Sequence, residues 1–536
     1  MLERELKFHV PPRQRTGLKA RLHKLGAEPA ELHARYYDTE NQVLARAHIA
    51  LRLRREDGIW IQTIKTPGPD ELSRVEWNHP RPGPTLDLGL YADTHIGALM
   101  ANVAGRLRCR YITHVIRLKK VVPTGSGSAE LAYDEGAIVA NGIELPIHEF
   151  EIEGVSGEAR DLFALSREWL WEHRLVLELR SKAARGDAIA SLGSENAPEG
   201  GLGSWDPDAP PRGGKARGMK LSPQHIQRLA APVRAGQPLL SADTGIHAAY
   251  LECANDCMSQ IIRNSGFLAG LDSMKTSNEQ RIEYVHQIRV GIRRLRACWQ
   301  LFGAAANPPE SLRDMLKQHF AVLGQARDLD VIQTELLPRL MKAGMPPDAT
   351  QAPIDHSEES TQRARKVASP EFQQALLDLL EHLVLYGDAL RTTGSKTDAA
   401  PLLCRRLNIW LERIRRDARS FVEASWDARH DLRKRVKRLR YGMEFSQGIL
   451  DTTQLTPLRN ALVSAQKALG QLNDLYVAAE YYRGPGAKHP SAMFALGWLA
   501  ATQDHEAMAS DLALQELSKA GRFQPVSGKN RKRKRA

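Results

Sequence analysis

The chain has 536 residues, of which 42% are hydrophobic and only 6% aromatic, and its formal net charge at pH 7 is +12. This length exceeds what one ordinary hydrophobic core organises, so we expect two or three domains. No continuous apolar run is long enough for a membrane-spanning helix, and five scattered cysteines without paired spacing argue against a disulfide framework.

Residues 1–155 show the alternation of apolar and polar side chains that is typical of β-strands. Strands are predicted at residues 2–10, 49–54, 59–65, 73–77, 114–119, 130–133 and 147–153. Helices are predicted at residues 14–25 and 158–174, which gives an α+β pattern dominated by antiparallel sheet. The first segment, MLERELKFHV, is charged and strand-like rather than a signal peptide, so we expect a cytoplasmic protein.

After residue 186 the strand-like alternation is replaced by other sequence patterns. Residues 187–240 are rich in Gly, Pro, Ser and Ala and are predicted to be a linker. Hydrophobic residues then recur with a helical period over residues 241–520, and residues 521–536 form a basic tail. We therefore predict one domain over residues 1–186 and a second, all-α domain over residues 241–520.

The positive charge is concentrated in the residues that follow the first domain. Residues 1–186 carry 27 Lys and Arg against 25 Asp and Glu, whereas the remaining residues carry 48 against 38. A basic excess in one part of a protein favours a polyanionic partner. Charge alone does not decide whether that partner is nucleic acid, a phosphate polymer or a membrane surface.

Two motifs occur twice in the helical region. The segment HQIRVGIRRLR, from His286 to Arg296, corresponds to HDLRKRVKRLR, from His430 to Arg440. A second motif follows each copy, as LGQARDL at residues 323–329 and as LGQLNDL at residues 469–475. Repetition of two motifs in the same order predicts a duplicated helical bundle.

Charged side chains recur at alternate positions of the predicted strands, and in several strands they all have one sign. Since alternate residues of a strand share a face, Glu3, Glu5 and Lys7 lie opposite an apolar face. One such strand would be an ordinary solvent-exposed face. Wholly acidic and wholly basic strands together are better explained by a closed barrel with a charged interior, where carboxylates hold divalent cations and guanidinium groups hold phosphate.

These residues resemble the CYTH family, the triphosphate tunnel metalloenzymes. The family signature Glu-x-Glu-x-Lys stands here as Glu3, Glu5 and Lys7. The other family elements follow in order as Arg52, Arg54, Lys65, Arg74, Glu76, Arg117, Lys119, Asp134 before a turn at Gly136, Glu149, Glu151, Glu153 and Lys182. The resemblance covers about residues 1–186 and implies an eight-stranded antiparallel β-barrel tunnel that binds triphosphate.

The same resemblance implies three sets of site residues. Phosphate would be bound by the basic side chains Arg52, Arg54, Lys65, Arg74, Arg117 and Lys119. Mg²⁺ or Mn²⁺ would be held, in one or two sites, by Glu3, Glu5, Glu149, Glu151 and Glu153. The catalytic set would be Glu3, Glu5, Lys7, Asp134 and Lys182, with Asp134 completing a metal site or orienting the attacking water.

Each copy of the helical motif carries a cationic stripe beside an apolar stripe. At about 100° per residue, the cationic stripes consist of His286, Arg289, Arg293 and Arg296, and of His430, Arg433, Lys437 and Arg440. The apolar stripes consist of Ile288, Ile292, Leu295 and Trp299, and of Leu432, Val436, Leu439 and Met443. A solvated basic face is the plainer interpretation, but the duplication in register favours a binding surface.

This repeat resembles the CHAD family, the conserved-histidine α-helical domains, over about residues 240–520. The resemblance implies polyphosphate binding by the two cationic stripes, with Arg294 and Arg438 beside them. The two histidines could pair with phosphate or anchor their helices by hydrogen bonds. We see no nucleophile, metal cluster or phosphate-binding loop in this region, so we expect binding without catalysis.

The sequence therefore predicts hydrolysis of inorganic triphosphate in the first domain and polyphosphate binding in the second. The alternatives are a non-catalytic protein of polyphosphate granules, or another CYTH activity such as thiamine triphosphatase or adenylyl cyclase. Nucleic acid is an unlikely partner, because no groove-reading motif is present and aromatics are not interleaved with the basic stripe. No membrane partner is expected.

Overall fold

The computed structural model describes residues 2–192, 221–271, 277–346, 365–393, 397–487 and 490–526. The chain divides into two compact units. The first comprises Met1–Pro232, Ile262–Gln280 and Val367–Gly387, and the second comprises Val233–Ile261, Arg281–Lys366 and Asp388–Ala536. The first unit thus takes in two segments from the region that we predicted to be a separate helical domain.

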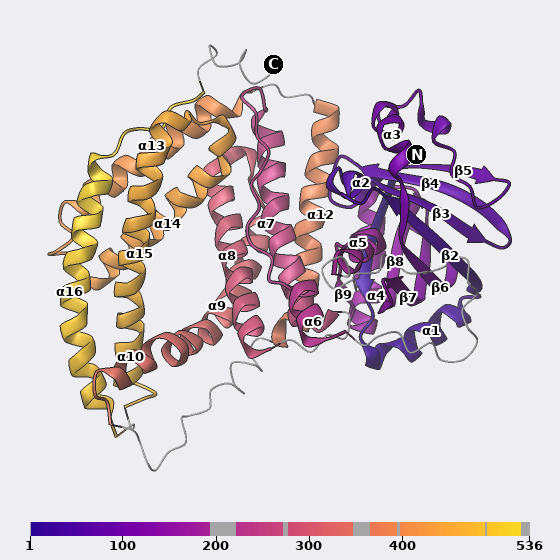
Figure 1. The fold of residues 1–536 in the computed structure, drawn as a ribbon. Helices are drawn as coiled ribbons and strands as arrows, with labels where there is room; N and C mark the ends of the chain where they lie inside the picture. Colours follow the sequence, from indigo (N-terminus) through magenta and orange to yellow (C-terminus); the bar gives the residue numbers. More distant parts are fainter. Residues whose placement is uncertain are drawn as a thin grey trace. The chain divides into compact units, whose positions relative to one another are not determined.

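Within residues 2–192, eight antiparallel strands close into a barrel (Figure 1). Neighbours follow the order β5-β4-β3-β2-β6-β7-β8-β1, β5 pairs with β1 to close the ring, and a short strand β9 pairs with β1. The strands are β1 (Leu2–His9), β2 (Glu28–Asp38), β3 (Ala50–Glu56), β4 (Ile59–Pro67), β5 (Ser73–Arg81), β6 (Arg108–Pro123), β7 (Ser128–Ala140), β8 (Ile143–Ser156) and β9 (Val176–Leu177). The predicted eight-stranded antiparallel barrel is confirmed.

Two details of the sheet differ from the sequence prediction. Strand β2 was not predicted, although it pairs with β3 without any shift of register and with β6 with one shift, between Tyr36 and Tyr37. Gly136 lies inside β7 rather than at a turn. A Cβ atom at this position would lie 1.9 Å from the carbonyl oxygen of His114, so glycine allows β7 to approach β6 closely.

Alternation along the strands sorts the side chains between the two faces of the barrel. Lys119 of β6 contacts Glu56 of β3, although β2 lies between these strands, and Lys65 of β4 contacts Glu3 of β1 past β5. Contacts that bridge non-neighbouring strands place these charges in the interior. The hydrophobic core therefore lies on the outer face of the sheet, under the helices that cover it.

Helices cover the outer face of the barrel. The ring of Trp169 in α4 (Ala159–His173) lies 4.8 Å from that of Phe150 in β8, and Arg21 of α1 (Arg15–Lys24) lies 3.9 Å above the same indole. A second cluster packs Leu51 and Ile64 against α2 (Val43–Arg46) and α3 (Gly97–Val103). The predicted helices at residues 14–25 and 158–174 correspond to α1 and α4.

The described residues between 244 and 520 are mainly helical, as predicted. Its main helices are α7 (Ile246–Leu268), α8 (Asn278–Phe302), α9 (Glu310–Val331), α10 (Leu337–Lys342), α12 (Pro370–Thr393), α13 (Ala399–Ala418), α14 (Trp426–Phe445), α15 (Thr452–Arg483) and α16 (Ala492–Lys519). The two copies of the basic motif lie on α8 and α14, and every residue of both predicted apolar stripes is buried. Ser425 caps α14 by accepting a hydrogen bond from the backbone N–H of Ala428.

The expected linker holds regular structure at both of its ends. Helix α5 (Lys182–Leu192) runs into it, and α6 (Pro223–Leu229) begins at a Ser222 cap. Residues 193–220 and the Lys- and Arg-rich end of the basic tail lie outside the described residues. Helix α6 was missed because it is short and its polar sequence has little periodicity.

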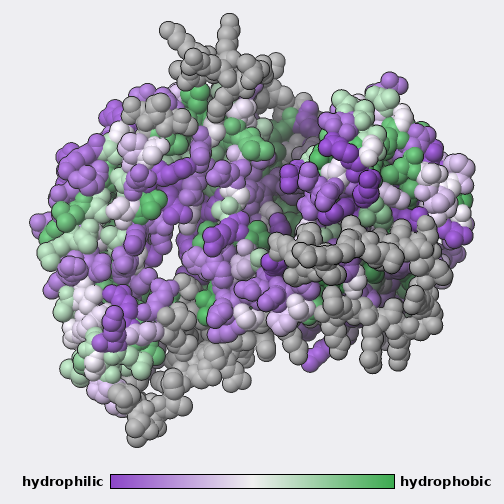
Figure 2. All heavy atoms as spheres, in the orientation of Figure 1, coloured by the Kyte–Doolittle hydropathy of each residue, from purple (hydrophilic) through white to green (hydrophobic). Residues whose placement is uncertain are grey.

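Hydrophilic and hydrophobic side chains are interspersed on the visible surface (Figure 2). Along α16, Met493, Met508 and Leu512 are largely exposed. None of the described helices combines the length and the apolar character needed to cross a bilayer.

Candidate active site

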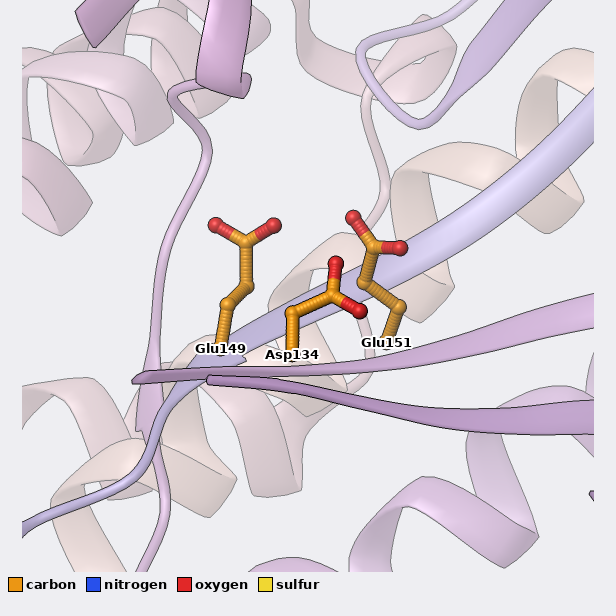
Figure 3. Close-up of side chains that lie close together, drawn as sticks. All are labelled: Asp134, Glu149 and Glu151. Carbon is orange, nitrogen blue, oxygen red and sulfur yellow. The ribbon is translucent and has the colours of Figure 1, made fainter. Parts of the chain in front are cut away.

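Three carboxylates meet inside the barrel. Asp134 of β7 and Glu149 of β8 are cross-strand partners, and Glu151 follows on the same face of β8. One oxygen from each lies within 4.8 Å of the others, and all three residues are buried. Figure 3 shows the three side chains extending from the strands into a shared space. In the described part of the chain, only this group brings His, Cys, Asp and Glu side chains close enough to hold a metal ion.

Two cations contact this group of carboxylates. Arg117 of β6 donates from Nε and Nη2 to the two oxygens of Asp134, each at 2.7 Å, and from Nη2 to Glu151 at 2.5 Å. The ammonium group of Lys182 lies 2.7 Å from Asp134 and 2.9 Å from Glu151, and it also contacts Glu149. These charge-assisted contacts fix the carboxylates in one arrangement.

The three carboxylates differ in their affinity for protons. Burial raises the pKa of Glu149 to about 7, although Lys182 lies beside it. Burial also opposes ionisation of Glu151, but Lys182 and Arg117 outweigh it and hold the pKa of this carboxyl well below its usual range. The group therefore binds a proton most readily at Glu149 near neutral pH.

A second acidic group lies along β1, β5 and β8. Glu5 contacts Lys7 and is the cross-strand partner of Glu153, while Glu3 lies 3.1 Å from Lys65. Burial raises the pKa values of Glu3 and Glu153 to about 7, and their acidic neighbours add to the effect. Lys65 also contacts Glu76. The carboxyl groups of Glu3 and Glu153 can therefore each gain or lose a proton near neutral pH.

Most of the predicted phosphate-binding residues contact carboxylates. Arg52 lies 3.5 Å from Glu76, and Arg54 lies 2.9 Å from Glu56, which also contacts Lys119 at 2.7 Å. Burial, with Arg52 nearby, lowers the pKa of Arg54 to about 10, which indicates excess positive charge at this position.

Arg74 behaves differently from the other predicted phosphate-binding residues. Its guanidinium donates to the carbonyl oxygens of Ser73 at 2.7 Å and Glu71 at 3.3 Å, although Arg74 is the cross-strand partner of Glu3.

Sequence reasoning missed several residues of this network. Arg185 is 4% exposed and donates to Glu149 at 3.3 Å and to the carbonyl oxygen of Pro146 at 2.9 Å. It stands three residues after Lys182 on α5, so helical spacing was the signal that could have identified it. Glu56 shares its strand face with Arg52 and Arg54, and the same alternation would have added it to the set.

A cationic cluster lies between helices of the second unit. Burial, followed by the neighbouring Arg433 and Arg293, lowers the pKa of Lys437 to about 6, with Arg289 adding to the effect and Asp474 of α15 opposing it. Arg289 and Arg293 belong to α8, whereas Arg433 and Lys437 belong to α14. Four residues of the predicted cationic stripes, two from each motif copy, therefore act on one another.

The other predicted stripe residues have distinct surroundings. His430 Nδ1 lies 2.9 Å from the side-chain oxygen of Asn473, which belongs to the second copy of the other repeated motif. Arg440 forms an ion pair with Glu444 at 2.9 Å. Arg296 is exposed and lies 5.9 Å from the ring of Phe320. His286 is half-buried on α8.

Arg294 does not flank the stripe as we expected. It is 1% exposed and donates to Asp256 at 2.6 Å and to Gln260 at 2.9 Å. A guanidinium that is buried and paired in this way stabilises the packing of α7 against α8 and is closed to a ligand. The error arose because sequence spacing cannot show which side of a stripe a neighbouring helix covers.

Comparison with known proteins finds two domain models that match the chain. The model of the CYTH domain matches residues 1–186, and the model of the CHAD domain matches residues 268–483. An inorganic triphosphatase from Haemophilus influenzae is 31% identical over 163 residues, which make up 29% of this chain and 45% of that protein. The chain thus spans less than half the length of this curated relative.

Two solved structures also resemble parts of the chain. The CHAD domain from the plant Ricinus communis is 26% identical, covering 55% of this chain and 99% of that one with a TM-score of 0.47. A Hippeastrum protein, described as a candidate adenylyl cyclase with a dominant triphosphatase activity, is 20% identical, covering 35% of this chain and 96% of that one with a TM-score of 0.27. From the two family matches, the chain contains a CYTH domain over residues 1–186 and a CHAD domain over residues 268–483.

Proposed function

We propose that the CYTH domain hydrolyses inorganic triphosphate with the help of Mg²⁺ or Mn²⁺, and that the CHAD domain binds polyphosphate. The observation that carries the first part is the carboxylate group of Asp134, Glu149 and Glu151, which lies inside a closed barrel beside buried cations. A single interior that offers both carboxylates and guanidinium groups suits a phosphate chain with its metal ions.

The carboxylate group fits a hard divalent cation. Its three donors are all oxygen atoms, and they are already within 4.8 Å of one another. Asp134, Glu149 and Glu151 would hold the ion, because Mg²⁺ and Mn²⁺ prefer carboxylate and water ligands. When bound there, the ion neutralises phosphate charge and makes a coordinated water more acidic. Glu3, Glu5 and Glu153 would hold a second ion only if their side chains moved closer together, because among the described residues only the first group has its oxygens within 4.8 Å of one another.

The phosphate clamp would consist of Arg52, Arg54, Lys65, Arg74, Arg117 and Lys119. Most of these side chains are held by carboxylates before substrate arrives, so little conformational entropy is lost when phosphate oxygens replace those partners. Charge develops on oxygen as the phosphoanhydride bond breaks, and fixed cations stabilise that charge.

The catalytic set would be completed by Lys7, Lys182 and the carboxyl groups near them. Lys182 holds Asp134, Glu149 and Glu151 in place. A carboxylate whose pKa lies near 7 accepts a proton readily at neutral pH, which suits Glu3 for taking a proton from the attacking water. Lys7 forms an ion pair with Glu5 and so fixes the orientation of the Glu5 carboxylate.

A phosphate-release panel tests the proposed activity and separates it from related activities. The substrates are triphosphate, pyrophosphate, long-chain polyphosphate, ATP and thiamine triphosphate, each measured with Mg²⁺ and with EDTA. We expect triphosphate to be hydrolysed fastest and EDTA to abolish the reaction. Faster turnover of thiamine triphosphate, or cyclic AMP from ATP, would assign another CYTH activity. No turnover of any substrate would favour a non-catalytic granule-binding protein.

Polyphosphate binding by the CHAD domain is supported by the cluster of Arg289, Arg293, Arg433 and Lys437. Burial and the neighbouring cations of two helices lower the pKa of Lys437, and such a gathering of cations attracts a polyanion strongly. Competition between long-chain polyphosphate and double-stranded DNA at fixed salt tests the partner. We expect an Arg293→Ala, Arg433→Ala double variant to lose at least about tenfold in polyphosphate affinity. Stronger binding of DNA would assign nucleic acid instead.

A further inference from the structure

The short strand β9 lies beside the N-terminal strand of the barrel. Phe8 and His9 of β1 pair with Leu177 and Val176 of β9. The backbone N–H of Glu178 then donates to the carbonyl oxygen of Lys7 at 2.9 Å. Since β1 carries Glu3, Glu5 and Lys7, the position of β9 is tied to a strand of the candidate active site.

A residue of the CHAD domain holds the other side of β9. The backbone N–H of Leu177 donates to Gln373 Oε1 at 2.9 Å, and Gln373 Nε2 donates to the carbonyl oxygen of Val367 at 2.6 Å. Gln373 lies on α12 and is 0% exposed. It falls within residues 268–483, which match the CHAD domain, yet it belongs to the compact unit that contains the barrel.

The segment after β9 leads directly to the carboxylate group. Glu178 forms an ion pair with Arg180, whose guanidinium lies 4.7 Å from the ring of Phe267 in the part of α7 that belongs to the same unit. Two residues later, Lys182 begins α5 and contacts all three carboxylates, Asp134 among them. Residues 176–182 thus run from the Gln373 contact to the candidate active site.

We propose that Gln373 is a positioning residue for the CYTH site, and that its buried amide holds residues 176–182 so that Lys182 reaches the carboxylates. This inference rests on the proposed hydrolysis and assigns the CHAD domain a part in it. The amide satisfies one backbone donor and one backbone acceptor that no water could reach, so its loss leaves both unpaired. Residues 176–182 can then shift, and the ammonium group of Lys182 shifts with them.

The same surface offers a matched control away from β9. Arg167 of α4 forms ion pairs with Asp378, at 2.8 Å, and with Glu381, both on α12. An Arg167→Met variant weakens the attachment of α12 to α4 without touching the backbone of residues 176–182. If general attachment of α12 were the cause of any effect, this control would show it as well.

Two substitutions at position 373 separate positioning from packing. Gln373→Met keeps the length of the side chain and removes its donor and acceptor. Gln373→Glu, protonated because burial raises the pKa of a carboxyl, offers one acceptor and one donor in the same places. A role in packing alone predicts similar behaviour of both variants, whereas a role in positioning predicts rescue by glutamate.

The experiment uses the full chain and combines kinetics with hydrogen exchange. Triphosphate hydrolysis at saturating Mg²⁺ gives kcat and KM, and exchange of residues 176–182 is followed by mass spectrometry in metal-free protein. We expect Gln373→Met to lower kcat about tenfold with KM changed by less than about twofold, and to speed exchange of this segment. Gln373→Glu should restore most of the kcat and most of the protection of this segment from exchange. Arg167→Met should resemble the unsubstituted protein in both measurements.

Unchanged kcat and unchanged exchange in Gln373→Met would overturn the proposal. An equal loss in Arg167→Met, or no recovery in Gln373→Glu, would overturn it too, because the effect would then belong to the whole surface or to packing. If the unsubstituted chain releases no phosphate from triphosphate, the proposed activity fails, while the exchange comparison still decides whether Gln373 holds the segment.

Discussion

Polyphosphate binding should become tighter as the pH falls from 8 to 6, because Lys437 must gain a proton to pair with phosphate. Burial and the surrounding Arg433 and Arg293 lower the pKa of this amine to about 6, with Arg289 adding to the effect and Asp474 opposing it. The free protein therefore holds the amine mostly uncharged at pH 8. A bound polyanion compensates the neighbouring cations and returns the pKa towards its ordinary value of about 10.4.

The size of the effect follows from these two values. If only the charged amine binds, the apparent affinity scales with the protonated fraction, which is about one half at pH 6 and about one hundredth at pH 8. Affinity should therefore rise about fifty-fold between pH 8 and pH 6, equivalent to about 2.3 kcal/mol. Burial lowers the pKa of His430 as well, so this imidazole contributes little charge in most of that range.

Anisotropy of labelled long-chain polyphosphate at constant ionic strength measures this dependence, and calorimetry in two buffers measures proton uptake, which should be about one per site at pH 7.5. Lys437→Arg supplies the control, because arginine stays charged and should flatten the pH dependence. The reasoning would be refuted if the affinity for polyphosphate depended on pH equally in the unsubstituted protein and in Lys437→Arg. Binding without proton uptake would refute it as well.

Three further predictions concern the barrel and the helical core. Glu5→Gln should reduce metal-dependent triphosphate hydrolysis at least about a hundred-fold while the melting temperature changes little, and full turnover at saturating Mg²⁺ would contradict the assignment. Because burial raises the pKa of Glu149 to about 7, Mn²⁺ should bind about tenfold more weakly at pH 6 than at pH 8. Glu149→Gln should remove that dependence in an electron paramagnetic resonance titration. Arg294→Leu should cost about 3–5 kcal/mol in the free energy of unfolding, since Asp256 loses its buried partner. A denaturant titration should show recovery of most of that loss when Asp256→Leu is added.

The barrel was predictable because its signal is local. Alternation along one strand is enough to place Glu3, Glu5 and Lys7 on one face, and the same rule sorted the other strands. The buried apolar stripes of α8 and α14 followed from helical spacing in the same way. Strand β2 was missed, although its pairing with β3 is continuous from Leu32 to Tyr37.

The arrangement of the site depends on pairings that sequence spacing does not contain. Asp134 joins Glu149 only through the register of β7 and β8. The sequence resemblance assigned five glutamates to metal without ranking them, namely Glu3, Glu5, Glu149, Glu151 and Glu153. The burial of Arg294 depends on where α7 lies, and the contact between Gln373 and Leu177 joins residues 196 positions apart. Such long-range contacts are fixed by tertiary packing, which no local pattern encodes.

The central claim is that the carboxylates inside the barrel make triphosphate hydrolysis depend on a divalent metal. Phosphate release from triphosphate, measured during a Mg²⁺ titration of the full chain and of its Glu151→Gln variant, tests this claim most directly. The account predicts saturable activation by Mg²⁺ in the unsubstituted chain and at least about a hundred-fold lower turnover in the variant at a similar melting temperature. Identical turnover and Mg²⁺ dependence in the two proteins would contradict it.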